Sequence, residues 1–350
     1  MFNYKGKTIY MGIDVHKNSY SVSVICDKVL VKRDKLVADP KILLKYCNNF
    51  KGAHIKSAYE AGFCGFYLHR FLLTNGIENI VVNPASIEIS ARDVVKTDKR
   101  DSLKIVTQLS DGRLSCIYIP SVKREDKRNL TRLREQFVKQ KNRSACQIKS
   151  VLHLYGLIEA HTNSRVCDAW LKKTLKLKLE KNCQFRLQKL SETWRYFDLQ
   201  LKLINKEIAK EAKEDHWLEV IYCSSPGIGP TTARKLINEL DDMSQFSNEE
   251  KLFSYAGLTP REYSSGDHVR QGHITKKGKP IIRRLLVESA WVAIRTDSSL
   301  AAIFERISYK AGKKRAIIGV ARILLGRIRT CIKEKRLYRM PLQETDIQVA

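Results

Sequence analysis

The chain has 350 residues, of which 64 are Lys or Arg and 37 are Asp or Glu, and its formal net charge is +27. A surplus of this size repels itself in a compact protein, so it indicates a polyanionic partner, most simply nucleic acid. Hydrophobic residues make up 43% of the chain, which suffices for packed cores in two or three domains. No apolar run reaches 18 residues and no secretory signal opens the sequence, so we expect a cytoplasmic protein with no membrane partner.

The spacing of cysteine and histidine argues against zinc chemistry. The nine cysteines and eight histidines form no CxxC pair and no HExxH motif. CxxC and HExxH motifs are typical of zinc sites, and regularly spaced cysteines are typical of disulfide frameworks. We therefore predict neither, and we interpret the scattered thiols as ordinary residues in a reducing compartment.

Residues 1–115 are expected to fold as an α/β domain. Apolar runs come first and then alternate with helical stretches, a pattern typical of a mixed sheet flanked by helices. The expected strands are residues 8–15, 20–26, 29–32, 55–60 and 79–82, and the expected helices are residues 40–47, 66–73 and a segment from about residue 97.

Four carboxylates stand out in this domain. Asp14 interrupts the first apolar run, Glu60 ends another, and Asp98 and Asp101 share one face of the helix that follows. Ionised carboxylates that face a core are costly unless a cation lies among them, and Mg²⁺ or Mn²⁺ takes oxygen ligands of this kind. Two strand ends and a helix that meet at one sheet edge predict an RNase H-like nuclease core. Alternatively, each acid pairs with a nearby Lys or Arg, and the two helix acids only stabilise the helix N-terminus.

Residues 116–215 are expected to form a helical region. A strongly basic stretch without Gly or Pro carries apolar residues at helical intervals, and a similar pattern runs through residues 187–208. Two long helices in an antiparallel hairpin or coiled coil explain both patterns best. Two interpretations stay open: a solvated helical spacer, or an interface for partner helices with a basic outer face for nucleic acid.

Residues 216–350 are expected to form a mostly helical C-terminal domain. The segment Pro226-Gly227-Ile228-Gly229 precedes an amphipathic helix, and two glycines around one apolar residue let backbone N–H groups approach a phosphate. This pattern predicts a helix-hairpin-helix element that grips a DNA backbone, although any tight turn into a helix also needs glycine. The expected phosphate contacts are Gly227, Gly229, Thr231 and Thr232, with Arg234 and Lys235 as supporting charges.

A long loop rich in Gly, Ser and basic residues follows a helix that we expect Ser247 to cap, with Glu250 at capping-box spacing. Long loops inside compact domains are usually functional, although Ser264-Ser265-Gly266 alone would suit a flexible turn. A long helix is expected from Pro280, and two basic helices follow it. The candidate phosphate contacts downstream of the serines, to the DNA backbone or to a transferring phosphoryl group, are Arg270, Lys276 and Lys277.

Two separated sets of motifs carry a family resemblance. The first set is GIDVHK, YEAGFCGFYLHRFL, NPASI and VKTDKRDS, and the second is PGIGPTTARKL, YAGLTPREYSSG and GHITKKGKPIIRRLLVESAW. With these motifs, which span nearly the whole chain, the sequence resembles the DEDD transposases of bacterial insertion sequences, the group that includes Piv-like and MooV-like proteins. Members of that group have been described as recombinases guided by a bridge RNA.

The resemblance implies a site and a set of partners. Asp14, Glu60, Asp98 and Asp101 align with the four acids of a RuvC-like domain that binds Mg²⁺. Ser265 aligns with a serine that attacks the scissile phosphodiester and holds the DNA through a phosphoserine link, with Ser264 as the alternative.

The implied partners are the DNA of the element ends and the target, a non-coding guide RNA, and further copies of the chain in a dimer or tetramer. The acids and the serine of one composite site would come from different subunits, and the middle helices would serve assembly and RNA contact. The implied location is the bacterial cytoplasm, at the nucleoid. Asp267 departs from the family pattern, in which many relatives carry a second Gly after Gly266.

Two other functions compete with a transposase or recombinase. A metal-dependent, structure-specific DNA nuclease of the Holliday-junction resolvase kind would use the same acids to activate water. A non-enzymatic nucleic-acid-binding protein would keep the fold without the chemistry.

Overall fold

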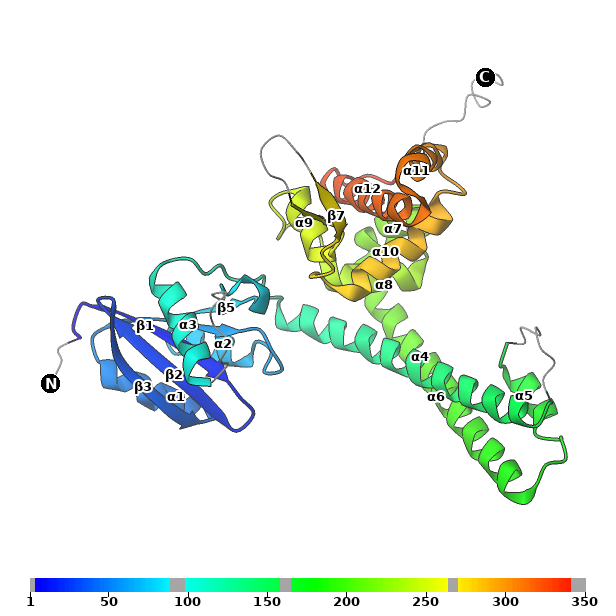
Figure 1. Cartoon of the computed structure of the whole chain (residues 1–350), viewed down its shortest axis with the longest axis horizontal. Coiled ribbons are helices and arrows are strands. Elements are labelled where there is room, and N and C mark those ends of the chain that lie inside the picture. Colours follow the sequence, from blue (N-terminus) through cyan, green and yellow to red (C-terminus); the bar gives the residue numbers. More distant parts are fainter. Residues whose placement is uncertain (1–3, 89–97, 158–164, 264–269, 341–350) are drawn as a thin grey trace. The chain divides into compact units, whose positions relative to one another are not determined.

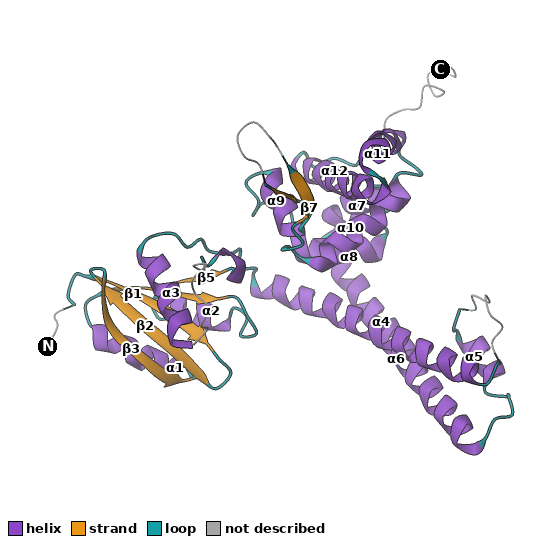
Figure 2. Cartoon of the chain, viewed as in Figure 1, coloured by secondary structure: helices purple, strands orange, loops and turns teal. Residues whose placement is uncertain are grey.

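The computed structural model describes residues 4–88, 98–157, 165–263 and 270–340, and the chain divides into two compact units, residues 1–119 and residues 120–350. The first unit holds a five-stranded sheet, and the second is almost entirely helical (Figures 1 and 2). The predicted α/β N-terminal domain with a mostly helical remainder is therefore confirmed. None of the helices in the described ranges combines the length and the apolar character needed to cross a membrane.

The sheet of the first unit has the strand order β3-β2-β1-β4-β5. Strands β1, β4 and β5 are parallel, whereas β2 and β3 run antiparallel to their neighbours. This order agrees with the RNase H-like core expected from the sequence. The strands are β1 (Thr8–Val15), β2 (Ser19–Cys26), β3 (Val29–Val37), β4 (His54–Glu60) and β5 (Glu78–Val82).

Strand β3 is longer than predicted, because it continues past Lys32 to Val37 and pairs with β2 along its length. Its second half carries charged residues, which are tolerated at the exposed edge of a sheet and hid the strand from a search for apolar runs.

Helices cover both faces of this sheet. On one face, α1 (Pro40–Cys47) and α2 (Tyr67–Thr74) bury the apolar side chains of β1. On the other face lies α3 (Asp98–Ser110), the helix that carries two of the predicted site acids (Figure 1). The main apolar core between the sheet and α1 and α2 includes Ile9, Met11, Ile13, Leu43 and Leu72.

Helix α3 approaches β1 so closely that only glycine fits between them. A Cβ at Gly12 would lie 2.3 Å from the carbonyl oxygen of Ser102 and 2.5 Å from the backbone nitrogen of Val106. Beside this contact, the Oγ atoms of Ser23 and Ser102 are 2.8 Å apart in a buried hydrogen bond. Small residues on β1 and β2 therefore fix where α3 lies.

The second unit begins with two long helices, α4 (Val122–Leu154) and α6 (Lys181–Glu214). Residues further along α4 contact residues earlier in α6, so the helices are antiparallel, as predicted. The contacts that show this are Lys127 with Glu214, Arg134 with Asn205, and Lys141 with Asp198. A short helix, α5 (Asp168–Thr174), packs on the end of the hairpin where α4 ends and α6 begins, in a small apolar cluster around Leu152, Leu171 and Leu187.

The rest of the second unit surrounds one large apolar core. The helix predicted from Pro280 is present. The elements are α7 (His216–Ser224), α8 (Pro230–Leu240), α9 (Glu249–Ala256), β6 (Pro260–Glu262), β7 (Gln271–Ile274), α10 (Pro280–Ala293), α11 (Ser298–Ala311) and α12 (Lys313–Lys333).

Two local predictions for this region were wrong. Helix α9 is capped by Asn248, whose side chain accepts a hydrogen bond from the backbone N–H of Lys251, and not by Ser247. Asn caps a helix as well as Ser does, so the sequence allowed both starts. The expected irregular loop also contains an antiparallel hairpin, since β6 pairs with β7.

We predict that Gly12→Ala displaces α3. The added Cβ would overlap backbone atoms of α3, which cannot rotate away, and overpacking of a core costs about 1–3 kcal/mol. Hydrogen–deuterium exchange should become faster in α3 and β1. Gly229→Ala is the control, because its Cβ would meet nothing within 4 Å, and it should leave exchange in α3 unchanged. Unaltered α3 exchange in Gly12→Ala would contradict the packing described.

Candidate active site

Two of the predicted acids lie at the carboxyl ends of neighbouring parallel strands. Strands β1 and β4 pair Ile13 with Tyr59, so the next positions along the two strands are Asp14 and Glu60. Side chains alternate along a strand, and Gly12 faces α3, so Asp14 belongs to the same face. The Asp14 side chain is 19% exposed and Glu60 is exposed. The structure therefore places both acids at one edge of the sheet.

The other two acids lie on α3. Asp101 directly precedes Ser102, the residue that contacts β1 and β2, and its side chain is 24% exposed at the margin of the packed face. The buried face of α3 is centred on Ser102, Ile105 and Val106, so Asp101 points less directly inward than the sequence spacing predicted. Asp98 is the first residue of the helix, and its side chain lies outside the described part of the structure.

Two positively charged or hydrogen-bonding side chains accompany these acids, and sequence analysis did not single them out. His16 Nε2 lies 2.9 Å from Asp14 Oδ2, and Lys104 Nζ lies 3.5 Å from Asp101 Oδ1. Their spacings could have revealed them, because i and i+2 share a face of a strand, and i and i+3 share a face of a helix. Lys104 thus places a positive charge beside Asp101, and the imidazole of His16 lies against Asp14.

The donor set suits a hard divalent cation. Carboxylate oxygens from β1, β4 and α3 are the ligand type that Mg²⁺ and Mn²⁺ prefer. Among the side chains that the structure describes, no three Asp, Glu, His or Cys residues form a ready group for a metal ion. The described set lacks the Asp98 side chain, which the resemblance counts among the four ligands.

The predicted nucleophile, Ser265, lies outside the described residues, as do Ser264 and Asp267. Its two flanks are described. The backbone N–H of Tyr263 donates a hydrogen bond of 2.9 Å to the carbonyl oxygen of Arg270, next to the β6–β7 pairing. The residues on the two sides of the serine segment, Tyr263 and Arg270, are therefore hydrogen-bonded to each other beside the β6–β7 pairing.

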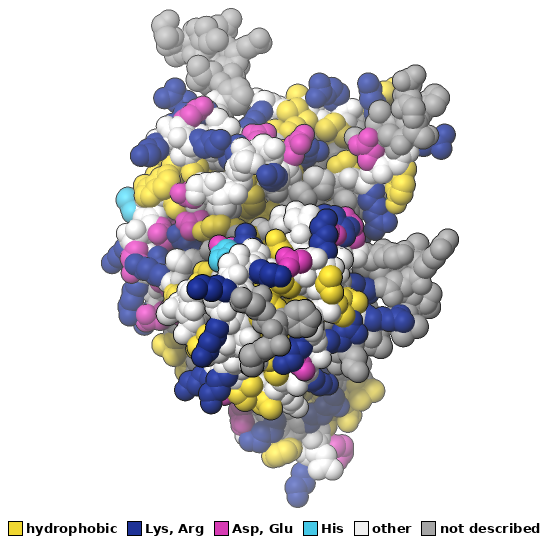
Figure 3. Space-filling model, turned by 90° about the vertical axis from the view of Figure 1, so that its left-hand side faces the viewer, with side chains coloured by type: hydrophobic (Ala, Val, Ile, Leu, Met, Phe, Trp, Pro, Cys, Tyr) yellow, Lys and Arg dark blue, Asp and Glu magenta, His cyan; other side chains and the backbone are white. Residues whose placement is uncertain are grey.

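The basic residues downstream of the serines are exposed. Arg270, Lys276 and Lys277 are all open to solvent. Lys276 has a positive φ of 56°, in a tight turn where Gly278 packs against the end of α9. A Cβ at Gly278 would lie 2.3 Å from the carbonyl oxygen of Tyr255, so glycine fixes the path of this turn. Lys and Arg side chains also spread over the face of the molecule that Figure 3 presents.

The two glycines of the turn between α7 and α8 lie in different surroundings. Gly227 has φ +75°, and a Cβ there would lie 2.2 Å from the carbonyl oxygen of Ser289 on α10, so packing alone requires this glycine. Gly229 faces open space at the start of α8, and Thr231 is exposed while Thr232 is half-buried. The N-terminus of α8 is therefore accessible, whereas Gly227 is explained by the fold.

The expectation that Arg234 and Lys235 support phosphate binding was wrong. Both side chains are buried in ion pairs that join α8 to other helices. Arg234 donates hydrogen bonds to Asp215 (2.8 Å) and Glu219, and Lys235 pairs with Glu135 of α4. Their charge is used inside the protein and is not presented to a ligand.

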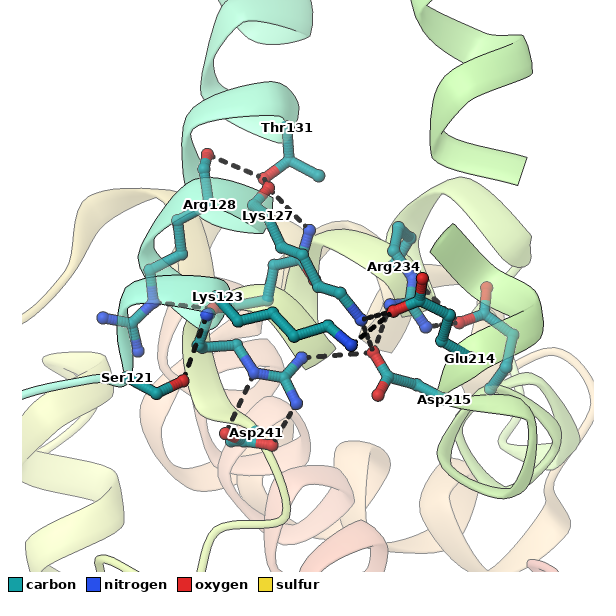
Figure 4. Close-up of polar contacts among 12 residues, drawn as sticks. Ser121, Lys123, Lys127, Arg128, Thr131, Glu214, Asp215, Arg234 and Asp241 are labelled. Carbon is teal, nitrogen blue, oxygen red and sulfur yellow. Dashed lines mark hydrogen bonds and ion pairs between the residues drawn. The ribbon is translucent and has the colours of Figure 1, made fainter. Parts of the chain in front are cut away.

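These residues belong to a buried charge network around the start of α4 (Figure 4). Asp215 accepts hydrogen bonds from Lys127 (3.0 Å) and Arg124 (3.3 Å) as well as from Arg234. Arg128 donates to the carbonyl oxygens of Asn238 (2.6 Å) and Glu239 (2.9 Å), which lie in the last turn of α8. The network fixes the first half of α4 to the C-terminal helices.

Two family models match the chain. The DEDD-type IS110 transposase model matches residues 11–156, which include the four predicted acids. The model described as "Transposase IS116/IS110/IS902 family" matches residues 221–305, which include Ser265 and the glycine-rich turn. Both models describe transposases, and together they cover more than half of the sequence. The chain belongs to the IS110/IS116 family of transposases.

Individual relatives agree with this assignment. A Sinorhizobium fredii (strain NBRC 101917 / NGR234) protein named as a transposase, y4qE, is 30% identical over 250 residues, 69% of this chain and 59% of that protein. The transposase for insertion sequence element IS1111A of Coxiella burnetii is 26% identical over 277 residues, 74% of this chain and 72% of that protein. The transposase for insertion sequence element IS1533 of Leptospira borgpetersenii is 24% identical over 315 residues, 81% of this chain and 85% of that protein. The match thus spans 59% of the length of the first relative and more of the other two.

We predict that Asp215→Asn lowers the free energy of unfolding of the second unit. The substitution should also reduce the loss of this free energy at low pH. Burial alone raises the pKa of Asp215, but hydrogen bonds from Arg234 and Lys127 lower it to about 2. Because the folded-state pKa is below the unfolded value, this stabilisation is present above about pH 4 and is lost as the pH falls towards 2. Removing one partner of a buried pair costs about 3 kcal/mol at pH 7.

Urea denaturation of the wild type and the variant at pH 7 and at pH 2.5 measures both effects. The difference between the two proteins should be large at pH 7 and should shrink at pH 2.5. Asp168→Asn is the control, since Asp168 makes an exposed pair with Arg195 and should matter much less. Equal effects of the two substitutions would contradict the structural role of the network.

We also predict that Lys276→Gln reduces the salt dependence of DNA binding. A lysine that contacts one phosphate contributes about one unit to the slope of log affinity against log salt concentration. Lys310→Gln, an exposed lysine on α11, serves as the control. An unchanged slope in Lys276→Gln would show that this lysine does not contact a phosphate.

Proposed function

We propose that this protein cuts and rejoins DNA during transposition of an insertion sequence. The observation that supports this proposal is the placement of acids at one end of the sheet of the first unit. Asp14 and Glu60 lie at the carboxyl ends of adjacent parallel strands, and Asp101 lies on α3, the helix that covers the Asp14 face of the sheet. Family membership supports the same activity, as do relatives named as transposases.

Asp14, Glu60, Asp98 and Asp101 would hold Mg²⁺ or Mn²⁺. When bound, such an ion activates a nucleophile and neutralises charge on a transferring phosphoryl group. His16 lies against Asp14 and Lys104 lies against Asp101, and these contacts help to orient the two carboxylates.

Ser265 is the proposed nucleophile. Its Oγ attacks the scissile phosphorus, an Oγ–P bond forms, and the P–O bond to one DNA strand breaks, with its electron pair on the departing oxygen. The hydroxyl proton passes to a base. A DNA hydroxyl later attacks the phosphoserine, which restores Ser265 and rejoins the strand. The hairpin of β6 and β7 presents the segment that carries the serine.

The DNA backbone is bound by the second unit in this proposal. Arg270, Lys276 and Lys277 are exposed beside the serine segment and can neutralise phosphates. Gly229 and Thr231 lie at the accessible start of α8, where backbone N–H groups and the helix dipole favour an anion. Gly227 shapes this turn without needing to touch DNA.

The proposed partners extend beyond DNA. A non-coding guide RNA would direct the protein to the element ends and to the target, and a homodimer or tetramer would bring acids and serine from different subunits together. The α4–α6 hairpin is the proposed surface for assembly and RNA contact, because both helices carry many exposed basic residues. The expected place of action is the bacterial nucleoid in the cytoplasm.

The direct test of this function is a covalent adduct assay. We incubate the purified protein with DNA of the element ends and target, the RNA encoded beside the gene, and Mg²⁺. We expect DNA cleavage together with protein covalently attached to DNA. Ser265→Ala should abolish the adduct and leave DNA binding intact, and Ser264→Ala is the matched control that should keep the adduct.

Other outcomes would identify the competing functions. Cleavage that survives Ser265→Ala without any adduct would favour a hydrolytic nuclease of the junction-resolvase kind. Tight binding with no cleavage under any metal or RNA condition would favour a non-enzymatic nucleic-acid-binding protein. Loss of the adduct in Ser264→Ala alone would identify Ser264 as the nucleophile in place of Ser265.

A further inference from the structure

The loop that follows Glu60 displays an aromatic side chain to solvent. Residues 61–66 connect β4 to α2, and Phe63, three residues after Glu60, is 73% exposed. A phenyl ring in water gains nothing for folding, since the hydrophobic effect rewards its burial. Phe63 is therefore available for a role outside the stability of the unit.

This loop is held in a defined conformation. The hydroxyl of Tyr59, a fully buried residue, donates a hydrogen bond of 2.9 Å to the carbonyl oxygen of Gly65. The N–H of Gly65 bonds to the carbonyl oxygen of Gly62 (3.3 Å), and the N–H of Ala61 bonds to β5 (2.9 Å). Gly65 has φ +57°, which glycine adopts readily. The protein thus presents Phe63 on a pinned turn.

A neighbouring aromatic residue shows the contrast. Phe66, in the same loop, packs against the apolar core, and the guanidinium of Arg70 lies 5.8 Å from the centre of its ring. Phe63 has no such contact among the described residues. Tyr67, in the first turn of α2, is 66% exposed. The loop therefore packs Phe66 against the core and leaves Phe63 open to solvent, and the exposed ring of Tyr67, which lies 6.4 Å from that of Phe71, follows at the start of α2.

The exposed rings lie at the same sheet edge as the acids. Glu60 is the last residue of β4, and Asp14 is one residue from the end of β1. Burial raises the pKa of Tyr20, and the nearby groups that raise it further include Cys64 and Tyr67. Tyr20 pairs with Val15, the residue after Asp14, and both pack in the core beside α1 and α2, so the loop lies at the end of the sheet that carries Asp14, on the face opposite α3.

We infer that Phe63 is a positioning residue that stacks on an unpaired DNA base next to the phosphodiester that the acids engage. This inference rests on the proposed function. A base offers a flat π-face of the size of the phenyl ring, and stacking of this kind tolerates any base sequence. A strand held at its base beside the acids keeps the scissile phosphate in register with them. Tyr67 provides a second ring along the same strand.

The test begins with a DNA fragment whose cleavage site has been mapped with the full-length wild-type protein. We compare Phe63→Ala and Phe63→Trp, with Tyr309→Ala as the matched control. Tyr309 is 93% exposed on α11, which has no part in the proposed site. Because all of these side chains are exposed, thermal unfolding should not change.

We expect Phe63→Ala to lower the single-turnover cleavage rate at saturating protein by about tenfold, the loss that one base–aromatic stack corresponds to. Phe63→Trp and Tyr309→Ala should cleave at the wild-type rate. In a second readout, 2-aminopurine replaces single bases around the mapped site, and binding is measured in an Asp14→Asn background that leaves the DNA intact. At one position the fluorescence of 2-aminopurine should differ between the wild-type and Phe63→Ala complexes, because only the wild-type ring stacks on that base. Phe63→Trp should give the same fluorescence as the wild type.

The outcomes separate the inference from the function on which it rests. If the wild type cleaves and Phe63→Ala cleaves equally well with identical emission at every position, the stacking role is wrong while the proposed function stands. An equal loss in Tyr309→Ala would also overturn it, since the effect would not belong to this loop. If the wild type does not cleave DNA at all, the proposed function fails and the inference falls with it.

Discussion

The geometry of the acidic site depends on how closely α3 approaches β1. Gly12 leaves room for the backbone of α3, and the Ser23–Ser102 hydrogen bond fixes the helix sideways on the sheet. Parallel pairing of β1 with β4 then brings Asp14 and Glu60 to the edge that α3 covers. An α3 displaced by one side-chain layer would carry Asp101 away from both strands. Small residues at the centre of the sheet therefore decide whether carboxylates from three separate segments can act together.

The second unit uses its positive charge in two ways. One set is internal: Arg124, Lys127 and Arg234 surround Asp215 and fix α4 to the C-terminal helices. Such buried charges are costly when unpaired, so they specify one arrangement of the helices. The other set, which includes Lys276 and Lys277, is exposed and available to a polyanion. The number of Lys and Arg residues, 64, is therefore not a measure of the nucleic-acid surface, because some of them pair with acids inside the fold. The net charge of +27 already counts those acids.

Sequence patterns predicted the features that depend on local periodicity. The strands that end at Asp14 and Glu60, the acid-bearing helix and the antiparallel hairpin all follow from apolar spacing. Features set by distant contacts escaped prediction. Arg234 looks like a ligand-binding residue until Asp215 and Glu219 are found beside it, and the close packing of Gly227 against Ser289 could not be read from the sequence. The β6–β7 hairpin escaped because its strands are short and polar.

The central claim is that the acids of the first unit bind a divalent metal ion. Mn²⁺ is the suitable probe, since free Mn²⁺ gives an electron paramagnetic resonance signal that disappears on binding. We expect the full-length wild type to bind Mn²⁺, Asp14→Asn and Asp101→Asn to lose most of this binding, and Asp111→Asn, an exposed acid paired with Arg113, to retain it. A wild type that leaves the Mn²⁺ signal unchanged, or an Asp14→Asn variant that binds as tightly as the wild type, would contradict the account.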